Sequence, residues 1–373
     1  MPNFGRLTSV SIGLTLCCLL ILGCGFGPRS LVQTRLPYNE AVKQTSEEQF
    51  LLNIVRLRYT STPSSLGIAN IADQQELASG LQALPFFVAG GGDAGGYRAD
   101  VLPQATLSRA SRPTLSYTPL DDEEFTRRLF TPISLTGAFY LSKTTWPIST
   151  VFRLYLENLN WVSNAETASG PTPRDPPEYA RFLEGILALQ ELQDAELIKL
   201  FIDQKEEVVA GPFNDSADPS EMALKAIELK LEVRKTDQGY SLVRKKDRPI
   251  LVVDEAVAHE PAWLTFCQAF QLDPSARSLD ITAEELAPFT NDQPNGHLTQ
   301  LDLETRSLLQ VLFFVSHGID VPAEHLRSGQ APSTCNPDGS PFNWQQVLCG
   351  LFRVHSIKSK KRPENAYVAV RFR

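Results

Sequence analysis

The pattern of apolar positions begins with a short hydrophobic stretch behind a single positive charge. Arg6 precedes a run of mostly apolar residues that continues to Leu22 and ends at Gly23-Cys24-Gly25. A charged start, a short apolar segment and a small residue at its end are typical of a secretory signal. We therefore predict a signal peptide over residues 1–23. Residues 24–36 follow without a clear period and are predicted to form a tether.

Beyond the tether, apolar residues recur with the spacing of amphipathic helices. In the helix predicted after Trp146-Pro147, Arg153 and Glu157 fall on the outward side, opposite a stripe that is expected to be buried. Trp263, Phe266, Cys267 and Phe270 form another such stripe. The predicted helical segments are about 45–58, 121–130, 146–159, 178–201, 221–235, 263–270, 301–316 and 344–348.

Other segments show the alternation or the β-compatible composition of strands. The predicted strand regions are Leu66–Leu84 (one long strand or a hairpin), Val101–Thr118, Glu207–Val209, the hairpin of Tyr240–Val243 with Ile250–Val253, and the final segment Tyr367–Arg373. Pro103 and Pro113 restrict the second of these to a sheet edge or to broken strands, because proline lacks the N–H that a central strand must donate.

The order of these elements favours an α+β fold, an irregular mix of amphipathic helices and short antiparallel strands. The helices and strands do not alternate regularly, as a doubly wound parallel sheet requires. No internal repeat is visible, which disfavours solenoids and propellers. Residues 37–373 are predicted to form the folded body, and the proline-rich segment 169–177 is the best candidate for a boundary within it.

The end of the apolar N-terminal stretch carries a motif of its own. Ile21-Leu22-Gly23-Cys24 resembles the lipobox of bacterial lipoproteins, in which the cysteine becomes diacylated and forms the new N-terminus. The resemblance implies a lipid anchor on Cys24, such as palmitate, and two or more acyl chains hold a protein stably on a membrane. Two alternatives stay open: an uncleaved membrane anchor, since no charge occurs between Leu7 and Pro28, and an apolar tail of a cytosolic protein.

The residue after Cys24 bears on which membrane is reached. In lipoproteins of Gram-negative bacteria, an aspartate at this position often retains the protein in the inner membrane. Gly25 stands there in this chain. The resemblance therefore implies the outer membrane, with the body facing the periplasm.

Four further segments resemble a family of uncharacterised bacterial envelope lipoproteins. The most specific is Tyr38–Val42 followed by Glu48–Tyr59, with the sequences YNEAV and EQFLLNIVRLRY. The others are Trp146–Ile148, Thr305–Leu309 with Gly318–Pro322, and the final AYVAVRFR at Ala366–Arg373. The family has no established activity, so the resemblance implies only location and architecture. Its members continue beyond the last strand into a returning strand and a helix, which would make this chain a C-terminally shortened member.

Composition and charge exclude some functions. The chain has 373 residues, of which 42% are hydrophobic, a formal charge of −8 and a pI near 5.3. This composition supports a packed core and argues against a protein built to bind nucleic acid, because phosphates require a basic surface. The five histidines and six cysteines show no repeated close pairing, so no metal or cofactor is predicted.

The cysteines outside the signal allow one structural prediction. Cys335 and Cys349 flank a loop of a length that a disulfide can close in an oxidising periplasm, and we predict that they pair. The alternative is two separate thiols. Cys267 lies on an apolar stripe and is interpreted as a buried thiol rather than a nucleophile.

Two groups of basic residues are candidate binding sites. Asn53, Arg56 and Arg58 lie on one predicted helix and would anchor a binding groove, or else the arginines are structural and bond backbone carbonyls. The patch of Arg353, Lys358, Lys360, Lys361 and Arg362 would touch phosphate or lipid headgroups, although a solvated loop is the simpler interpretation.

These patterns favour a lipid-anchored protein of the bacterial envelope with a non-catalytic binding or scaffolding role. Its expected partners are the membrane, through the anchor, and an envelope protein or polymer. One alternative is an enzyme that acts on envelope polymers and whose active site carries no recognisable motif. The other is a subunit of an export or surface-assembly apparatus.

Overall fold

A computed structural model describes residues 26–89, 97–120, 122–142, 146–213, 226–236, 239–283, 298–359 and 361–372. The chain divides into two compact units. The first comprises residues 1–50 and 64–122, and the second comprises residues 51–63 and 123–373. Residues 169–177, the boundary suggested by the sequence, lie within the second unit. The expected α+β class is confirmed. The structure combines helices with small sheets whose strands are mostly antiparallel.

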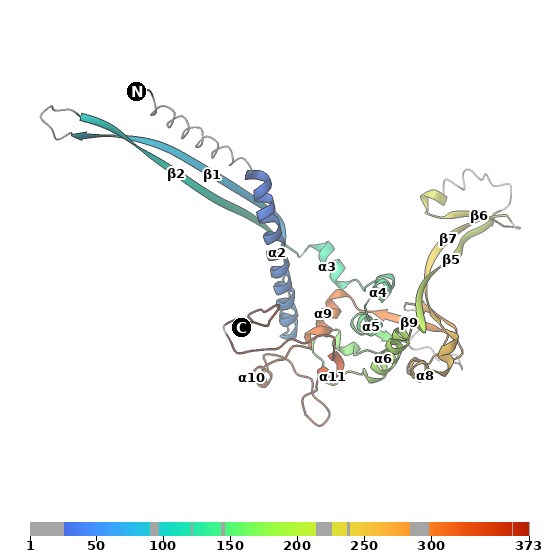
Figure 1. Cartoon of the computed structure of the whole chain (residues 1–373). Helices are drawn as coiled ribbons and strands as arrows, with labels where there is room; N and C mark the ends of the chain where they lie inside the picture. The colour runs from blue at the N-terminus through green and yellow to red at the C-terminus, as the bar shows by residue number, and fades with distance from the viewer. Residues whose placement is uncertain are drawn as a thin grey trace. The chain divides into compact units, whose positions relative to one another are not determined.

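The first unit contains most of one long helix and a two-stranded ribbon (Figure 1). The helix is α2, Phe26–Arg58, whose residues up to Phe50 belong to this unit. The ribbon consists of β1, Leu66–Ala89, and β2, Tyr97–Pro119, paired antiparallel along their full length. At about 3.3 Å per residue the ribbon is about 75 Å long. Gln49 of α2 contacts the base of the ribbon, because the Gln49 Oε1 accepts a hydrogen bond from the N–H of Leu66, the first residue of β1, at 3.0 Å.

Helix α2 includes residues that the sequence suggested would be a tether. Gly25, Gly27 and Pro28 led to that prediction, but Pro28 lies in the first turn of the helix, where its missing N–H breaks no helical bond. Pro37 lies inside the helix. None of the helices in the described part of the chain is long and apolar enough to cross a membrane.

The second unit is built around a mixed sheet with the strand order β4-β3-β9-β8-β7-β5, with β6 added beside β7. Only β8 and β9 run parallel; the other neighbours are antiparallel. The strands are β3 Leu156–Leu159, β4 Val162–Ser163, β5 Ile198–Phe213, β6 Glu232–Thr236, β7 Gly239–Val253, β8 Ser278–Thr282 and β9 Gln300–Thr305.

The helices of the second unit are mostly short. They are α3 Glu123–Phe130, α4 Leu135–Ser142, α5 Ile148–Tyr155, α6 Ala180–Asp194, α8 Pro261–Phe270, α9 Leu308–Ser316, α10 Ala323–Arg327 and α11 Gln345–Leu348, with 3-10 turns at Glu166–Ala168 and Glu255–His259. Helix α3, which falls within the predicted helical segment 121–130, begins with Glu123 and Glu124, and these acids complement the positive end of the helix dipole.

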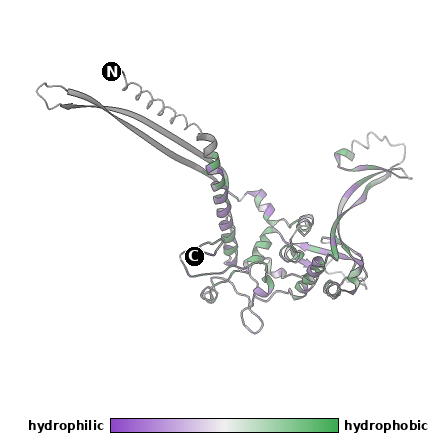
Figure 2. Cartoon of the chain, in the orientation of Figure 1, coloured by the Kyte–Doolittle hydropathy of each residue, from purple (hydrophilic) through white to green (hydrophobic). Residues whose placement is uncertain are grey.

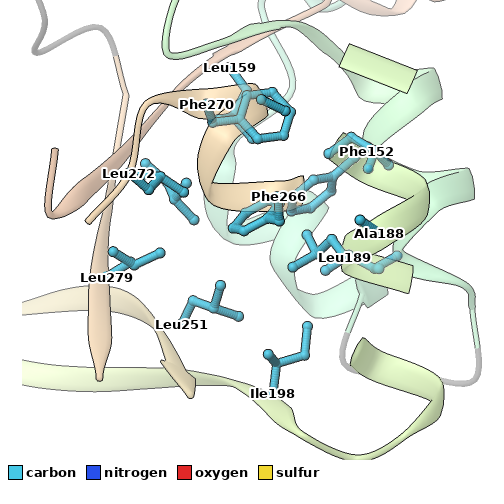
Figure 3. Close-up of a cluster of buried hydrophobic side chains, with 14 of the residues drawn as sticks. Phe152, Leu159, Ala188, Leu189, Ile198, Leu251, Phe266, Phe270, Leu272 and Leu279 are labelled. Carbon is cyan, nitrogen blue, oxygen red and sulfur yellow. The ribbon is translucent and has the colours of Figure 1, made fainter. Parts of the chain in front are cut away.

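One hydrophobic cluster fills the space between α5, α6 and α8 and the sheet (Figure 3). In this view Leu251 and Leu279 extend from strands toward Phe266 and Leu189 on the helices. Phe266 and Phe270 are fully buried, as the predicted stripe on α8 requires. Pro261 at the start of α8 is pre-organised for a helix, and Gln271 in the left-handed region ends it.

A second hydrophobic cluster joins the end of α2 to α9 and α11 within the same unit. Ile54 and Leu57 of α2 are buried there with Phe314 of α9 and Leu348 of α11. Figure 2 shows α9 as a largely hydrophobic helix, in keeping with this burial.

Four predicted helices are partly strands in the structure. The helix predicted over 178–201 ends at Asp194, because Glu196 takes a left-handed conformation (φ 57°) and strand β5 starts at Ile198. The helix predicted over 301–316 is strand β9 followed by α9. Of the helix predicted over 221–235, residues 221–225 lie outside the described residues, residues 226–228 are helical, and the last part is β6.

Arg153 and Glu157 were predicted to point outward, and this was wrong. The helix ends at Tyr155 and the chain continues as β3, which changes the faces on which later residues lie. Both residues are buried. Arg153 donates to the carbonyls of Val347 and Cys349, each at 2.9 Å, and Gln310 Nε2 donates to Glu157 Oε2 at 3.2 Å.

The segment predicted as a hairpin at residues 240–253 is one continuous strand, β7, and the predicted C-terminal strand is not formed. Residues 367–372, the described part of this segment, are not in strand conformation. Instead Phe372 packs on the ring of Tyr59, with 4.9 Å between the ring centroids, and Val370 packs beside it in the second cluster. Partial burial of Val370 and Phe372 in this cluster accounts for their apolar character.

Gly185 marks the closest approach between α6 and α8, and we expect Gly185→Ala to destabilise the protein. A Cβ at this position would lie 2.4 Å from Phe270 Cε2 and 2.7 Å from Ala269 Cβ. Overpacking of this kind lowers the free energy of unfolding by about 1–3 kcal/mol. Urea denaturation checks the effect, and Gly170→Ala is the control, because its Cβ meets no atom within 4 Å. Equal effects of the two substitutions would contradict the packing argument.

Candidate functional site

The most enclosed charged group in the described chain is the guanidinium of Arg306, which follows β9 and is fully buried. Its Nε donates to Ser169 Oγ at 2.9 Å. Its Nη1 donates to the carbonyls of Arg153 at 3.0 Å and Leu154 at 3.3 Å, and its Nη2 donates to the carbonyl of Asn164. The group also lies 4.1 Å from the ring centroid of Phe314. Three separate chain segments therefore meet at one side chain.

The electrostatics of Arg306 fit a structural role. Its hydrogen-bond partners are a hydroxyl and carbonyls, while Glu157 and Glu166 act on it through space. Burial lowers the pKa of Arg306 to about 9, and the two carboxylates oppose this shift. The guanidinium stays charged at pH 7 and donates hydrogen bonds to backbone oxygens that are buried with it.

Arg58 of α2 is a second buried arginine. Its Nη1 donates to the Pro332 carbonyl at 2.8 Å and to Thr172 Oγ1 at 3.0 Å. Burial lowers its pKa to about 10. These contacts are those of a structural arginine, the alternative that the sequence left open.

The other two candidates on α2, Asn53 and Arg56, lie five and two residues before Arg58. Asn53 is buried, and Arg56 is half-buried and donates from Nη1 to Asn53 Oδ1 at 3.0 Å. The structure thus brings Asn53 and Arg56 together on the helix. Arg58 makes its contacts with Thr172 and Pro332 instead.

His317 and Trp344 form a stacked pair in the second hydrophobic cluster, with 4.1 Å between ring centroids and a 33° interplanar angle. His317 Nδ1 lies 3.2 Å from the Phe314 carbonyl. Burial, assisted by the nearby positive charge of Arg58, lowers the pKa of His317 to about 4. His317 is therefore neutral at pH 7, and protonating it places a second positive charge in an apolar site.

One depression of about 260 Å³ lies on the second unit among α4, α5, α6 and the start of β5. Its lining includes the apolar residues Ile148, Leu200 and Phe201, and Lys199 contributes a positive charge. Gln193 at its wall is already engaged, because its Oε1 accepts from the Ile148 N–H at 2.9 Å. The lining supports contact with an apolar group better than it supports proton transfer.

One of the two expectations for the cysteines is not met in the structure. The predicted disulfide between Cys335 and Cys349 is not formed in the structure, where both thiols are free. Cys335 is held through its backbone N–H, which donates to the Arg174 carbonyl at 2.9 Å, whereas Cys349 follows α11 and is exposed. Cys267 is buried, and burial raises the pKa of its thiol to about 12, which leaves it protonated rather than nucleophilic.

Acidic neighbours partly neutralise the basic patch near the C-terminus. Arg353 Nη2 lies 3.3 Å from Asp320 Oδ2, and Lys358 Nζ lies 3.0 Å from Glu324 Oε1. The bond from Lys358 lowers the pKa of Glu324. Arg362 donates to the carbonyls of Ala366 and Tyr367, and Lys360 lies outside the described residues. These contacts leave less net charge for a phosphate than the sequence suggests.

Sequence reasoning missed the buried roles of Arg306 and His317. A local signal did exist for the first: Ser307 and Gln310 form a capping box, which marks the start of α9 and places Arg306 just before it. Cys24, the predicted lipidation site, lies outside the described residues. No protein-family model matches the chain, and no curated protein or solved structure is similar enough to it to count as a match.

Proposed function

We propose that this protein is a lipid-anchored component of the bacterial cell envelope that acts by binding or scaffolding. In this proposal Cys24 carries the lipid, and Gly25 after it favours the outer membrane, with the folded units facing the periplasm. The partners are other proteins or polymers of the envelope.

The observation that carries the binding role is the presence of two long ribbons with exposed apolar residues. The first is β1–β2, and the second is formed by β5 and β7 (Figure 1). On β5, Phe201, Val208 and Val209 are exposed, with 61% of Val208 accessible. Figure 2 shows hydrophobic and hydrophilic residues together along this second ribbon. Exposed apolar residues on extended strands are suited to contact a partner.

The anchoring part of the proposal rests on the lipobox resemblance and is tested by lipid labelling. We expect the full chain, expressed in a Gram-negative host with labelled palmitate, to incorporate the label and to sediment with the outer membrane. Cys24→Ser removes the acylated thiol, so it should carry no label and should leave the membrane fraction. Cys349→Ser is the matched control, because this thiol is exposed but lies far from the lipobox in sequence.

Label on the wild type and on Cys349→Ser, but not on Cys24→Ser, supports the proposal. Retention of unlabelled wild type and unlabelled Cys24→Ser in the inner membrane would instead indicate an uncleaved anchor. That result would overturn both the compartment and the orientation of the folded units.

A further inference from the structure

We infer that two copies of this chain associate by packing the same face of their β1–β2 ribbons together. The inference deepens the proposed scaffolding role and rests on it, because it names a second copy of the chain as one of the partners. It is carried by the register of the ribbon, the exposure of its base and the positions of its prolines.

The base of the ribbon has one apolar and one polar face. Cross-strand partners share a face, and the register pairs Ile71 with Leu115 and Ile68 with Tyr117. We call the face that carries these residues the apolar face. The opposite face carries three polar–small pairs: Ala72 with Thr114, Asn70 with Ser116, and Gly67 with Thr118.

The register extends the apolar face toward the far end of the ribbon. The apolar positions on it there are Leu77, Leu81, Ala83, Pro85, Phe87, Tyr97, Ala99, Val101, Pro103, Ala105 and Leu107. Its few polar positions are Asp73, Gln75, Ser79, Arg109 and Ser111. The apolar face therefore consists of two apolar stretches with a polar belt between them.

This face is partly open to solvent where the side chains are described, with Ile68 and Ile71 half-buried. Tyr117 is 56% exposed, Leu66 is 50% exposed and Leu115 is 42% exposed. Within the described chain, β1 and β2 pair only with each other. A two-stranded ribbon is marginally stable in water unless a further layer covers its hydrophobic face. The ribbon needs a partner that presents a complementary apolar surface of similar length.

The prolines favour packing through the face over pairing through the edge. Pro103 and Pro113 lie within β2, and Pro85 lies within β1. Proline occurs in strands where its missing N–H would point away from the paired neighbour, that is, toward the free edge. Both free edges are therefore interrupted as hydrogen-bonding templates, which disfavours the addition of another strand.

The area of the face matches what a stable pair of proteins buries. With strands about 4.8 Å apart and about 75 Å long, each face covers about 700 Å². Two such faces would bury about 1,400 Å² in total, within the range of about 1,200–2,000 Å² for specific interfaces. A second copy supplies this face in the same length and pattern, and anchoring both copies on one membrane raises their effective concentration.

Photo-crosslinking in intact cells tests the inference. Tyr117 on the apolar face, or Thr118 on the opposite face, is replaced by p-benzoylphenylalanine in full chains that carry two different tags and are expressed together. We expect a product of two chains that carries both tags when position 117 is substituted, and a much weaker one for position 118.

Paired charge substitutions provide the second arm, read as the mass of the full chain in mild detergent. Leu115→Glu with Tyr117→Glu places carboxylates on the apolar face, whereas Ser116→Glu with Thr118→Glu places them on the opposite face. We expect the first pair to weaken dimerisation by more than about tenfold, because burying unpaired carboxylates is unfavourable. The second pair should leave it unchanged. Circular dichroism checks that both variants remain folded.

The outcomes separate this inference from the proposed function. A monomer in detergent, with no product carrying both tags, overturns self-association. Crosslinks from position 117 only to lipid or to a different protein also overturn it, while leaving a binding role for the ribbon in place. Loss of membrane anchoring in the labelling experiment overturns the proposed location and does not bear on dimerisation of the purified chain.

Discussion

Arg306→Ala is expected to lower the free energy of unfolding by about 3–5 kcal/mol. The substitution removes a fully buried guanidinium that donates to Ser169 and to the carbonyls of Arg153, Leu154 and Asn164. The carbonyls of Leu154 and Asn164 would each lose a buried donor, which is costly in the interior, whereas the Arg153 carbonyl keeps a hydrogen bond from Asn164 Nδ2 at 2.9 Å. Denaturation in urea measures the loss, as a lower midpoint concentration.

Two further variants define the cause. Arg306→Lys keeps a positive charge but lacks the planar fork, so it should recover little of the lost stability. Arg128→Ala removes an exposed arginine that pairs with Glu124 on α3, and it should change stability by less than about 0.5 kcal/mol. A small effect of Arg306→Ala, comparable to that of Arg128→Ala, would show that the three segments do not depend on this side chain.

Acidification is expected to destabilise the protein through His317. Its pKa is about 4 in the folded chain, against an ordinary value of 6.5. Between these values the unfolded state binds more protons, so stability falls as the pH drops below about 6.5 and the loss is complete near pH 4. Between pH 7 and pH 5 this one residue should lower the free energy of unfolding by about 2 kcal/mol.

The comparison of variants isolates this contribution. His317→Phe keeps an aromatic ring against Trp344 but cannot be protonated, so its stability should fall less than that of the wild type between pH 7 and pH 5. Ser316→Ala alters the adjacent buried residue, whose Oγ donates to the Phe313 carbonyl at 2.7 Å, without changing a titrating group. It should keep the pH dependence of the wild type. An equal dependence in the wild type and His317→Phe would exclude the mechanism.

Elements with a local signal could be predicted from the sequence. The stripe of α8, the acidic start of α3 and the β-compatible composition of β1 and β2 each lie within a short segment. Strands β1 and β2 are longer than predicted. Pairing between them continues beyond the residues whose local sequence favours a strand.

Strand β7 illustrates what the sequence could not predict. Its charged middle, Arg244–Arg248, has the composition of a turn, and a hairpin was predicted. In the structure this segment is paired with an acidic stretch of β5, with Glu207 opposite Arg244 and Asp203 opposite Arg248. Opposite charges on paired strands stabilise a sheet. The information lies in residues about 40 positions apart, which a local pattern does not combine.

The candidate site was harder to predict, for a related reason. An arginine in a sequence gives no sign of whether it will be exposed or buried among carbonyls. Arg153 was placed on an outward helix face because it lies opposite the apolar stripe of α5, and its carbonyl partners at Val347 and Cys349 are nearly 200 residues away. Such contacts depend on tertiary packing.

The pairing of β7 has a mechanical consequence. Its first residues, Gly239–Val243, lie between β5 and β6, and its residues Ile250–Val252 lie between β5 and β8. The segment between them pairs with β5 alone in the described chain. A three-stranded end is thus joined to a three-stranded base by a two-stranded neck. The neck has fewer hydrogen bonds to resist bending, so the end of the ribbon can swing as a unit while its own strands stay paired.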